Sequence, residues 1–187
     1  MNDGLQWLPT VYQLGFCVTF VRDIGIDDMI RRMGGDPSTS LLMTLSQAEQ
    51  AELRDSEPGA VLRFGTSGAW SYAAESWGAH GGSGAVLARV SEGTEAVSFS
   101  RNERGQKSFS WAESGMLKCT FDPDAPEIRG GADPDALLEA LHNVGLLPEN
   151  EDAASTAAML TIAEQVFGLG LVRDEVASSE LRSVRFP

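Results

Sequence analysis

One stretch of the sequence combines side chains that could transfer a proton with a backbone suited to a binding loop. Glu75, Trp77 and His80 fall within six positions and overlap the glycine-rich segment Gly78–Gly84. A carboxylate and an imidazole can act as an acid–base pair when both reach the same reacting group. An indole can form the wall of a pocket. The sequence therefore predicts a pocket near this segment, with these three side chains as its candidate residues.

The segment Gly78–Gly84 does not match the known phosphate-binding loops. Backbone amides ahead of a helix can hold a phosphate. This segment lacks both the Gly-x-Gly-x-x-Gly spacing and the Gly-Lys-Ser/Thr ending of nucleotide-binding loops. These departures favour a surface loop or lid over a phosphate site.

Other catalytic and metal-binding patterns are weak. Gly65–Gly68 contains a serine, but it lacks the Gly-x-Ser-x-Gly spacing of a nucleophile elbow and separates two predicted strands. Cys17 and Cys119 lie in apolar strands and are expected to be buried, reduced thiols, a disulfide between them being the alternative. With His80 and His142 as the only histidines, the usual zinc spacings are absent. We expect no catalytic residue, no metal and no cofactor.

Acidic residues dominate the charge of the chain. Its 27 Asp and Glu residues exceed its 14 Lys and Arg residues, for a formal net charge of −13. Such a field repels nucleic-acid phosphates and anionic membranes and attracts cationic partners. We therefore expect no direct nucleic-acid or membrane binding and a protein partner that is basic. Acidity that serves only solubility is the alternative.

Five acidic side chains cluster in a proline-containing loop and in the helix expected after it. These candidate partner-binding residues are Asp122, Asp124, Glu127, Asp133 and Asp135. Their spacing does not fit an EF-hand loop, although hard cations favour such oxygen ligands. Asp133 also has the position of a helix cap, with Pro134 at the first helical position. A polar helix near Glu49 and Glu52 would extend the same acidic surface.

The fold prediction starts from Glu95–Asp122. Apolar and polar residues alternate in three short runs, and polar turns with Gly105 and Gly115 separate the runs. Alternation with a period of two indicates an antiparallel meander with one wet face. A hairpin over 60–74 precedes it, with its large apolar side chains expected on one packed face: Leu62, Phe64, Trp70 and Tyr72.

Helices are predicted around these strands. Ile26–Met33 carries an apolar stripe at helical spacing, and Thr44 with Gln47 forms a capping-box pattern before a second helix. Further helices are expected over 85–90, 133–145 and 154–167, with a charged linker at 148–152. The tail 171–187 fits either a short helix or a last strand.

This order of elements predicts an α+β fold, because strands occur in hairpins and no regular βαβ alternation is present. We expect a mostly antiparallel sheet of five to seven strands with helices packed chiefly on one face. The 187 residues suit a single domain, 1–187, in which 146–187 forms a C-terminal helical extension. No apolar run approaches the roughly 20 residues of a membrane span, and the N-terminus does not resemble a signal peptide. The expected location is cytoplasmic.

Several of these segments resemble an uncharacterised family of small actinobacterial proteins, a domain of unknown function. The resemblance rests on Phe16–Arg22, the helix that ends at Gly34, Met43–Leu45 and the meander from Gly93 to Pro123. It covers roughly Trp7 to Gly145. Because the family carries no assigned activity, the resemblance implies a fold and transfers no functional residue.

Three functions remain in competition. The leading hypothesis is an acidic, non-enzymatic protein-binding module, immunity-like or an accessory protein for a basic partner. The alternative is a small-molecule-binding protein or enzyme with a pocket near Gly78–Gly84. The third is a homodimer that pairs through a sheet edge or its C-terminal helix.

Overall fold

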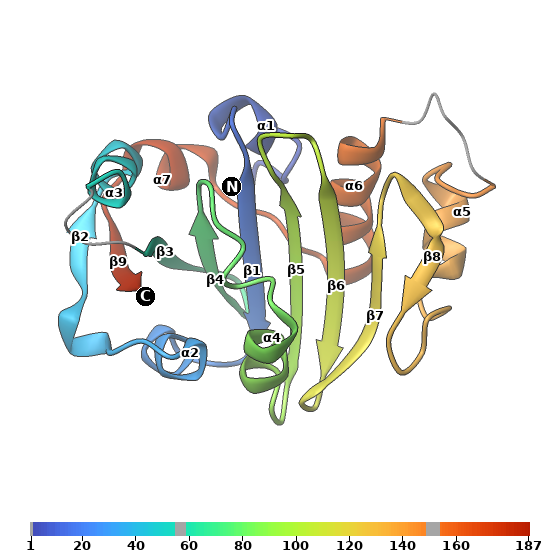
Figure 1. Cartoon of the computed structure of the whole chain (residues 1–187), viewed down its shortest axis with the longest axis horizontal. Coiled ribbons are helices and arrows are strands. Elements are labelled where there is room, and N and C mark those ends of the chain that lie inside the picture. Colours follow the sequence, from blue (N-terminus) through green and yellow to red (C-terminus); the bar gives the residue numbers. More distant parts are fainter. Residues whose placement is uncertain (1, 55–58, 149–153) are drawn as a thin grey trace.

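The computed structural model of the chain describes residues 2–54, 59–148 and 154–187. Its strands form one antiparallel sheet in the order β2-β9-β3-β4-β1-β5-β6-β7-β8 (Figure 1). The strands are β1 (Phe16–Arg22), β2 (Leu41–Met43), β3 (Ala60–Ser67), β4 (Trp70–Glu75), β5 (Glu95–Arg101), β6 (Lys107–Glu113), β7 (Met116–Asp122), β8 (Ala125–Gly130) and β9 (Leu181–Phe186). The α-helices are α1 (Leu8–Val11), α2 (Ile26–Met33), α3 (Leu45–Glu52), α4 (Gly84–Val90), α5 (Leu138–Asn143), α6 (Ser155–Phe167) and α7 (Arg173–Ser178).

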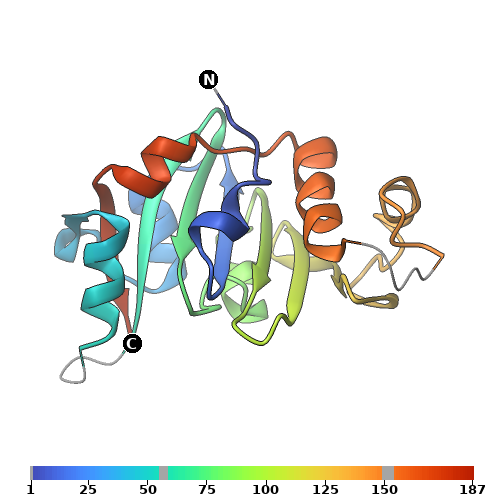
Figure 2. The same cartoon turned by 90° about the horizontal axis from the view of Figure 1, so that it is seen from above.

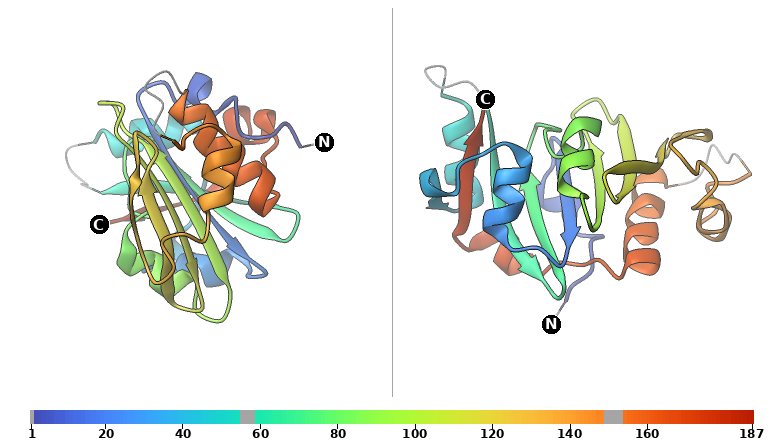
Figure 3. Two further views of the ribbon diagram at one scale, coloured as in Figure 1. Left: turned by 90° about the vertical axis from the view of Figure 1, so that its right-hand side faces the viewer. Right: turned by 90° about the horizontal axis from the view of Figure 1, so that it is seen from below.

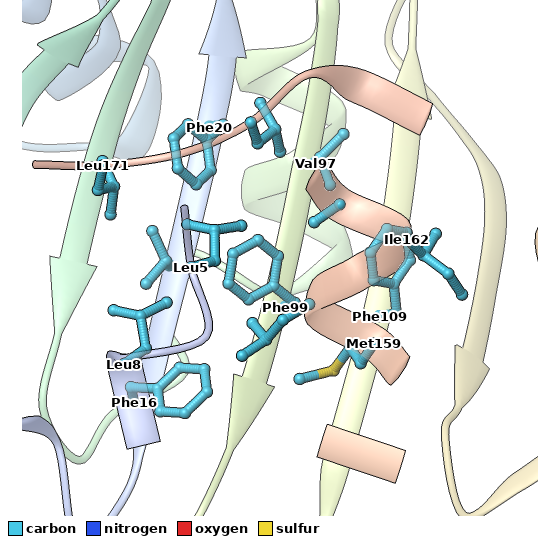
Figure 4. Packing of buried hydrophobic residues seen from close by; sticks show 14 of the residues in the cluster. Leu5, Leu8, Phe16, Phe20, Val97, Phe99, Phe109, Met159, Ile162 and Leu171 are labelled. Carbon is cyan, nitrogen blue, oxygen red and sulfur yellow. The ribbon is translucent and has the colours of Figure 1, made fainter. Parts of the chain in front are cut away.

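One face of the sheet carries an aromatic core. Phe16 and Phe20 of β1 lie beside Phe99 of β5 and Phe109 of β6, and all four are buried. The N-terminal segment and α6 cover them, as Leu5, Leu8, Met159 and Ile162 show in Figure 4. Burial of large apolar side chains is the main stabilising term in such a layer.

The opposite face has a second, smaller core under α2 and α4. Met29, Ile30 and Met33 of α2 pack with Val86, Leu87 and Val90 of α4 against the sheet. Seen from below, both helices lie on the side of the sheet away from α6 (Figure 3). The view from above shows α6 and α7 together on their own side (Figure 2). The sheet is therefore covered on both faces, with its two sets of helices formed by different parts of the chain.

The helix and strand signals in the N-terminal half and the meander are confirmed. The α2 helix spans Ile26–Met33 as predicted, and α3 begins with a capping box between Thr44 and Gln47. The meander Glu95–Asp122 forms β5, β6 and β7. Local signals were sufficient here because caps, periodicity and turn residues all agree.

The predicted size of the sheet is wrong, because the described residues form nine strands instead of five to seven. The additional strands carry weak signals: β2 has three residues, and β8 contains Pro126 within a segment read as an acidic loop. The ambiguous tail supplies both α7 and β9, and β9 lies inside the sheet between β2 and β3. The prediction that the helices pack chiefly on one face of the sheet is also wrong, since α2 and α4 cover the face opposite α6.

Two finer predictions differ from the structure, and a third falls largely outside the described residues. In the hairpin, Leu62 and Phe64 join the core under α2, while Trp70 and Tyr72 join the aromatic core, because Phe64 pairs with Ala73. The helix expected from Asp133 begins only at Leu138, since 133–137 form turns in which Ala136 and Leu138 donate to the carbonyls three residues earlier, at 3.1 and 2.9 Å. Of the linker predicted at 148–152, residues 149–152 lie outside the described residues.

Arg63 of β3 is a buried cation that joins several elements. Its side chain is 1 % exposed, and its guanidinium donates to the carbonyls of Val176 (2.7 Å), Ser179 (2.9 Å) and Met43 (3.3 Å). Val176 and Ser179 lie at the C-terminal end of α7, where backbone carbonyls carry partial negative charge. Arg63 therefore joins the end of α7 and β2 to strand β3.

We predict that Arg63→Met lowers the free energy of unfolding by about 3 kcal/mol, because each buried carbonyl left without a donor costs about 1–3 kcal/mol. Urea unfolding followed by circular dichroism measures the change. Arg104→Ala is the matched control, since Arg104 is exposed in the β5–β6 turn. Equal stability of the two variants would contradict the role given to Arg63.

Candidate functional site

The face of the sheet beside α4 carries a row of hydroxyl groups across four neighbouring strands. The register places Thr19 of β1 opposite Ser98, Ser98 opposite Ser110, and Ser110 opposite Thr120 of β7. The Thr19 and Ser98 oxygens are 3.0 Å apart, and the Ser110 and Thr120 oxygens are 2.9 Å apart. Side chains of directly opposed residues lie on the same face, so the row is continuous.

A second polar row lies one step farther along the same strands. Cys17 of β1 is opposite Ser100, which is opposite Ser108 of β6. Ser100 is half-buried and Ser108 is exposed. Within the part of the chain that the structure describes, neither serine hydroxyl donates or accepts a hydrogen bond. Both are therefore available to a bound molecule.

Two adjoining cavities open over these rows. One, of about 210 Å³, lies between Ser98, Ser100, Ser108 and Ser110 on the sheet and Ala79, Gly82 and Ser83 of the loop before α4. The other, of about 320 Å³, shares Ala79, Ser100 and Ser108 with the first and extends to Trp77 and Phe16. We call the two together the serine groove. In Figure 1 the loop that forms its roof runs in front of β1 and β5 toward α4.

The cations at the outer end of the serine groove are committed to other partners. Arg101 donates to the carbonyls of Tyr12 (3.2 Å) and Gln13 (3.0 Å). The Lys107 ammonium pairs with the Asp124 carboxylate at 2.7 Å. The groove therefore offers hydroxyls and an aromatic wall without a free positive charge among the described residues that line it.

Glu75 holds the loop that roofs the groove. Its side chain is 2 % exposed, and its carboxylate accepts the backbone N–H groups of His80 (3.0 Å) and Gly81 (2.9 Å). Burial raises the pKa of Glu75, and the two amides and the Cys17 thiol oppose that shift. Among the described residues, no lysine or arginine pairs with this carboxylate. Backbone dipoles therefore compensate its charge.

Two glycines permit this close docking of the loop. A Cβ atom on Gly78 would lie 2.5 Å from a Glu75 carboxylate oxygen, and one on Gly81 would lie 2.4 Å from the Thr19 hydroxyl. Both distances are far below van der Waals contact. The glycine-rich composition of the segment thus serves packing of the loop against β1 and β4.

The three pocket residues expected from the sequence take different positions. Trp77 lines the outer cavity of the groove. Glu75 lies beneath the loop. His80 points away from the groove: its Nε2 is 3.1 Å from the Met33 carbonyl, and the centre of its ring is 4.7 Å from the centre of the Phe186 ring. Glu75 contacts the His80 backbone and not its imidazole. The geometry therefore does not assemble an acid–base pair from these two side chains.

The five candidate acidic residues divide into paired and unpaired groups. Asp124 pairs with Lys107, and Asp135 pairs with Arg129 at 2.7 Å. Asp122, Glu127 and Asp133 form no ion pair with the described residues. The polar helix α3 uses Glu49 to accept the Ser76 hydroxyl at 3.1 Å. The acidic surface is thus less free than its sequence suggests.

The serines of the groove were absent from the sequence-based candidate residues. The alternation predicts Ser98, Ser100, Ser108 and Ser110 on the wet face of a meander; the structure places all four on one face but buries Ser98 and Ser110. The four serines occupy every second position of two neighbouring strands, and this spacing was a usable signal because it places all four on one face. The loop that covers them could not be placed without the fold.

Cysteines and acidic clusters give no further site in the described residues. Cys17 and Cys119 are both free and buried. Within residues 2–54, 59–148 and 154–187, no three side chains of His, Cys, Asp or Glu are arranged to hold a metal ion. The helices in the same ranges are all too short or too polar to cross a bilayer.

The chain was compared with known proteins. A model for a family of unknown function (DUF6461) matches residues 5–184. Membership of an uncharacterised family is therefore confirmed, and the match extends through the C-terminal helices and most of β9. No curated protein and no solved structure matches the chain.

We predict that Gly81→Ala lowers the free energy of unfolding by about 2 kcal/mol, because the new methyl group overlaps Thr19. Gly84→Ala is the matched control: no atom lies within 4 Å of its Cβ position, and alanine is the better helix former there. Thermal unfolding of both variants and hydrogen exchange at the His80 and Gly81 amides measure the effect. Unchanged protection of these amides in Gly81→Ala would contradict the docking of the loop.

Proposed function

The chain belongs to the family of unknown function DUF6461, and we propose that it binds a small polyhydroxylated ligand, of the sugar or polyol class, in the serine groove. The single observation that carries this proposal is the pair of uncommitted hydroxyls, Ser100 and Ser108, shared by two adjoining cavities. Hydroxyls that can both donate and accept suit a ligand with the same property.

The shape and lining of the groove support this ligand class. The outer cavity, about 320 Å³, lies at the lower end of the roughly 300–1,000 Å³ that small-molecule sites occupy. Trp77 adds an aromatic wall, and Gln106 adds a polar side chain at the rim. A ligand ring with an apolar face and a polar edge could pack against Trp77 and hydrogen-bond to Gln106.

The electrostatics argue against an anionic ligand. Arg101 and Lys107 are committed to backbone carbonyls and to Asp124, and the net charge of the chain is −13. A phosphate in the groove would face this field with no free cation to pair with among its described lining residues. Binding without catalysis is favoured because Glu75 and His80 do not converge on the groove.

We predict that the double variant Ser100→Ala/Ser108→Ala weakens sugar binding about tenfold, because each hydrogen bond contributes about 0.5–1.5 kcal/mol. Amide chemical shifts of the ¹⁵N-labelled protein, titrated with a panel of hexoses, pentoses and alditols, measure the affinity. Ser46→Ala, on the polar surface of α3, is the control. Failure of the whole panel to shift the amides of β5, β6 and the loop would refute the proposal.

A second candidate function is an acidic module that binds a basic protein. The outer strand β8 favours it, because Ile128 is 73 % exposed beside Glu127, and Glu127 and Asp133 lack ion-pair partners among the described residues. An exposed apolar side chain next to an unpaired carboxylate offers a basic partner both an apolar contact and a charge. Asp124 and Asp135 would contribute only after leaving Lys107 and Arg129.

For this second candidate we predict salt-sensitive retention of a partner from the native host. Glu127→Lys/Asp133→Lys should abolish retention, since rim charges act through complementarity that salt screens. Glu103→Lys, in the exposed β5–β6 turn, applies the same kind of charge change elsewhere. If neither salt nor the double substitution reduces retention of the partner, this surface is excluded as the binding site. A doubled mass in solution would instead indicate that the chain pairs with itself.

A further inference from the structure

The inner end of the serine groove consists of Ser98 and Ser110, which are 2 % and 5 % exposed. They lie one row closer to α4 than Ser100 and Ser108. A hydroxyl group has one proton and two lone pairs, so the partners within the protein decide what it presents to a ligand. The hydrogen bonds of these two serines can be followed atom by atom.

The proton of Ser110 has an acceptor inside the protein. The Thr120 hydroxyl donates to the Phe109 carbonyl at 3.0 Å, which uses its only proton. The 2.9 Å contact between Thr120 and Ser110 therefore has Ser110 as the donor. Ser110 is left with lone pairs on the side of the groove.

The proton of Ser98 is also accounted for. Two acceptors lie within its reach, the Cys17 sulfur at 3.6 Å and the Thr19 hydroxyl oxygen at 3.0 Å. Whichever of them accepts the Ser98 proton, the other can occupy only one of the two lone pairs of Ser98. Ser98, like Ser110, presents a lone pair to the groove.

The inner end also lies close to a buried carboxyl group, that of Glu75, which is directly opposite Cys17 on the paired strands β1 and β4. Glu75 lies behind Cys17 and has no lysine or arginine partner among the described residues. The loop packs closely over these atoms, since a Cβ on Gly82 would lie 3.3 Å from the Ser98 hydroxyl and 3.5 Å from the Cys17 sulfur. Two acceptors backed by a carboxylate favour a donor that carries positive charge.

We infer that the ligand of the serine groove carries an ammonium group, and that this group binds at the inner end against Ser98 and Ser110 while hydroxyl groups bind at Ser100 and Ser108. The ligand class is an amino sugar or an amino polyol. This inference rests on the proposed function, since it assumes that the groove is a binding site. The acidity of the whole chain, −13, favours the approach of such a cation.

The experiment compares matched pairs of compounds with the intact, ¹⁵N-labelled protein in a phosphate buffer without amines. D-Glucosamine is compared with D-glucose, and tris(hydroxymethyl)aminomethane with pentaerythritol, which replaces the amino group by a hydroxymethyl group. We expect each amine to bind about tenfold more tightly than its neutral partner, because hydrogen bonds to charged groups are roughly twice as strong. The preference should fall with added salt.

Variants localise the effect. Ser98→Ala/Ser110→Ala should remove the preference for the amine and leave the affinity for the neutral compounds unchanged. Ser100→Ala/Ser108→Ala should weaken both members of each pair and keep their ratio. Glu75→Gln should also reduce the ratio. Because Glu75 also holds the loop, the serine variants, which remove no bond to the loop backbone, keep the test decisive if that variant unfolds.

The outcomes separate the two proposals. Equal binding of both members of each pair, or tighter binding of the neutral member, overturns the ammonium inference and leaves the proposed function standing. If none of the four compounds shifts the amide signals of the groove, both the ammonium inference and the proposed function are overturned. An amine preference that survives Ser98→Ala/Ser110→Ala places the ammonium elsewhere and refutes the inference.

Discussion

Burial of β1 on both faces is the constraint on which the rest of the structure depends. Its residues alternate between the aromatic core, through Phe16 and Phe20, and the opposite face, through Cys17 and Thr19, and all four are at most 1 % exposed. β1 pairs with β4 on one side and β5 on the other. A shift of one residue would exchange the two faces, so the packing of the aromatic rings fixes the position of the polar rows as well.

Two buried charges hold irregular segments against this sheet. Arg63 binds carbonyls at the end of α7, and Glu75 binds amides of the loop before α4. Neither has an oppositely charged side chain as an ion-pair partner among the described residues. A buried charge is costly unless polar groups surround it, so both positions depend on the backbone being held in place. Glu75 differs in its consequence, because the segment that it holds forms the roof of the groove.

The groove and the outer acidic surface suggest a common electrostatic character for what binds here. Cations near the groove are used internally, as Lys107 is by Asp124, and the Ser110 proton is engaged by Thr120. The groove lining thus offers no free cation among the described residues, and β8 carries Glu127, which forms no ion pair with them. The proposed ammonium ligand and the proposed basic partner both rest on this scarcity of free cations.

By itself, the sequence determined the elements whose signals are local. The stripe of Ile26–Met33, the capping box at Thr44 and the alternation of Glu95–Asp122 predicted α2, α3 and the meander, because caps, periodicity and turns depend on neighbours a few positions away. The alternating serines of β5 and β6 were visible too, as one polar face. The glycines before α4 were visible in the sequence, but their role in close packing of the loop against the sheet was not.

Only the tertiary structure decided the features that join distant residues. It placed β9 inside the sheet, put Phe64 and Tyr72 on opposite faces, and attached Asp133 to β7 ahead of α5. It also turned His80 toward Met33 and brought Glu75, which is opposite Cys17, beneath the loop whose amides it accepts. Such contacts depend on strand order, register and burial, which are properties of the packed chain and leave no mark on the spacing of residues along it.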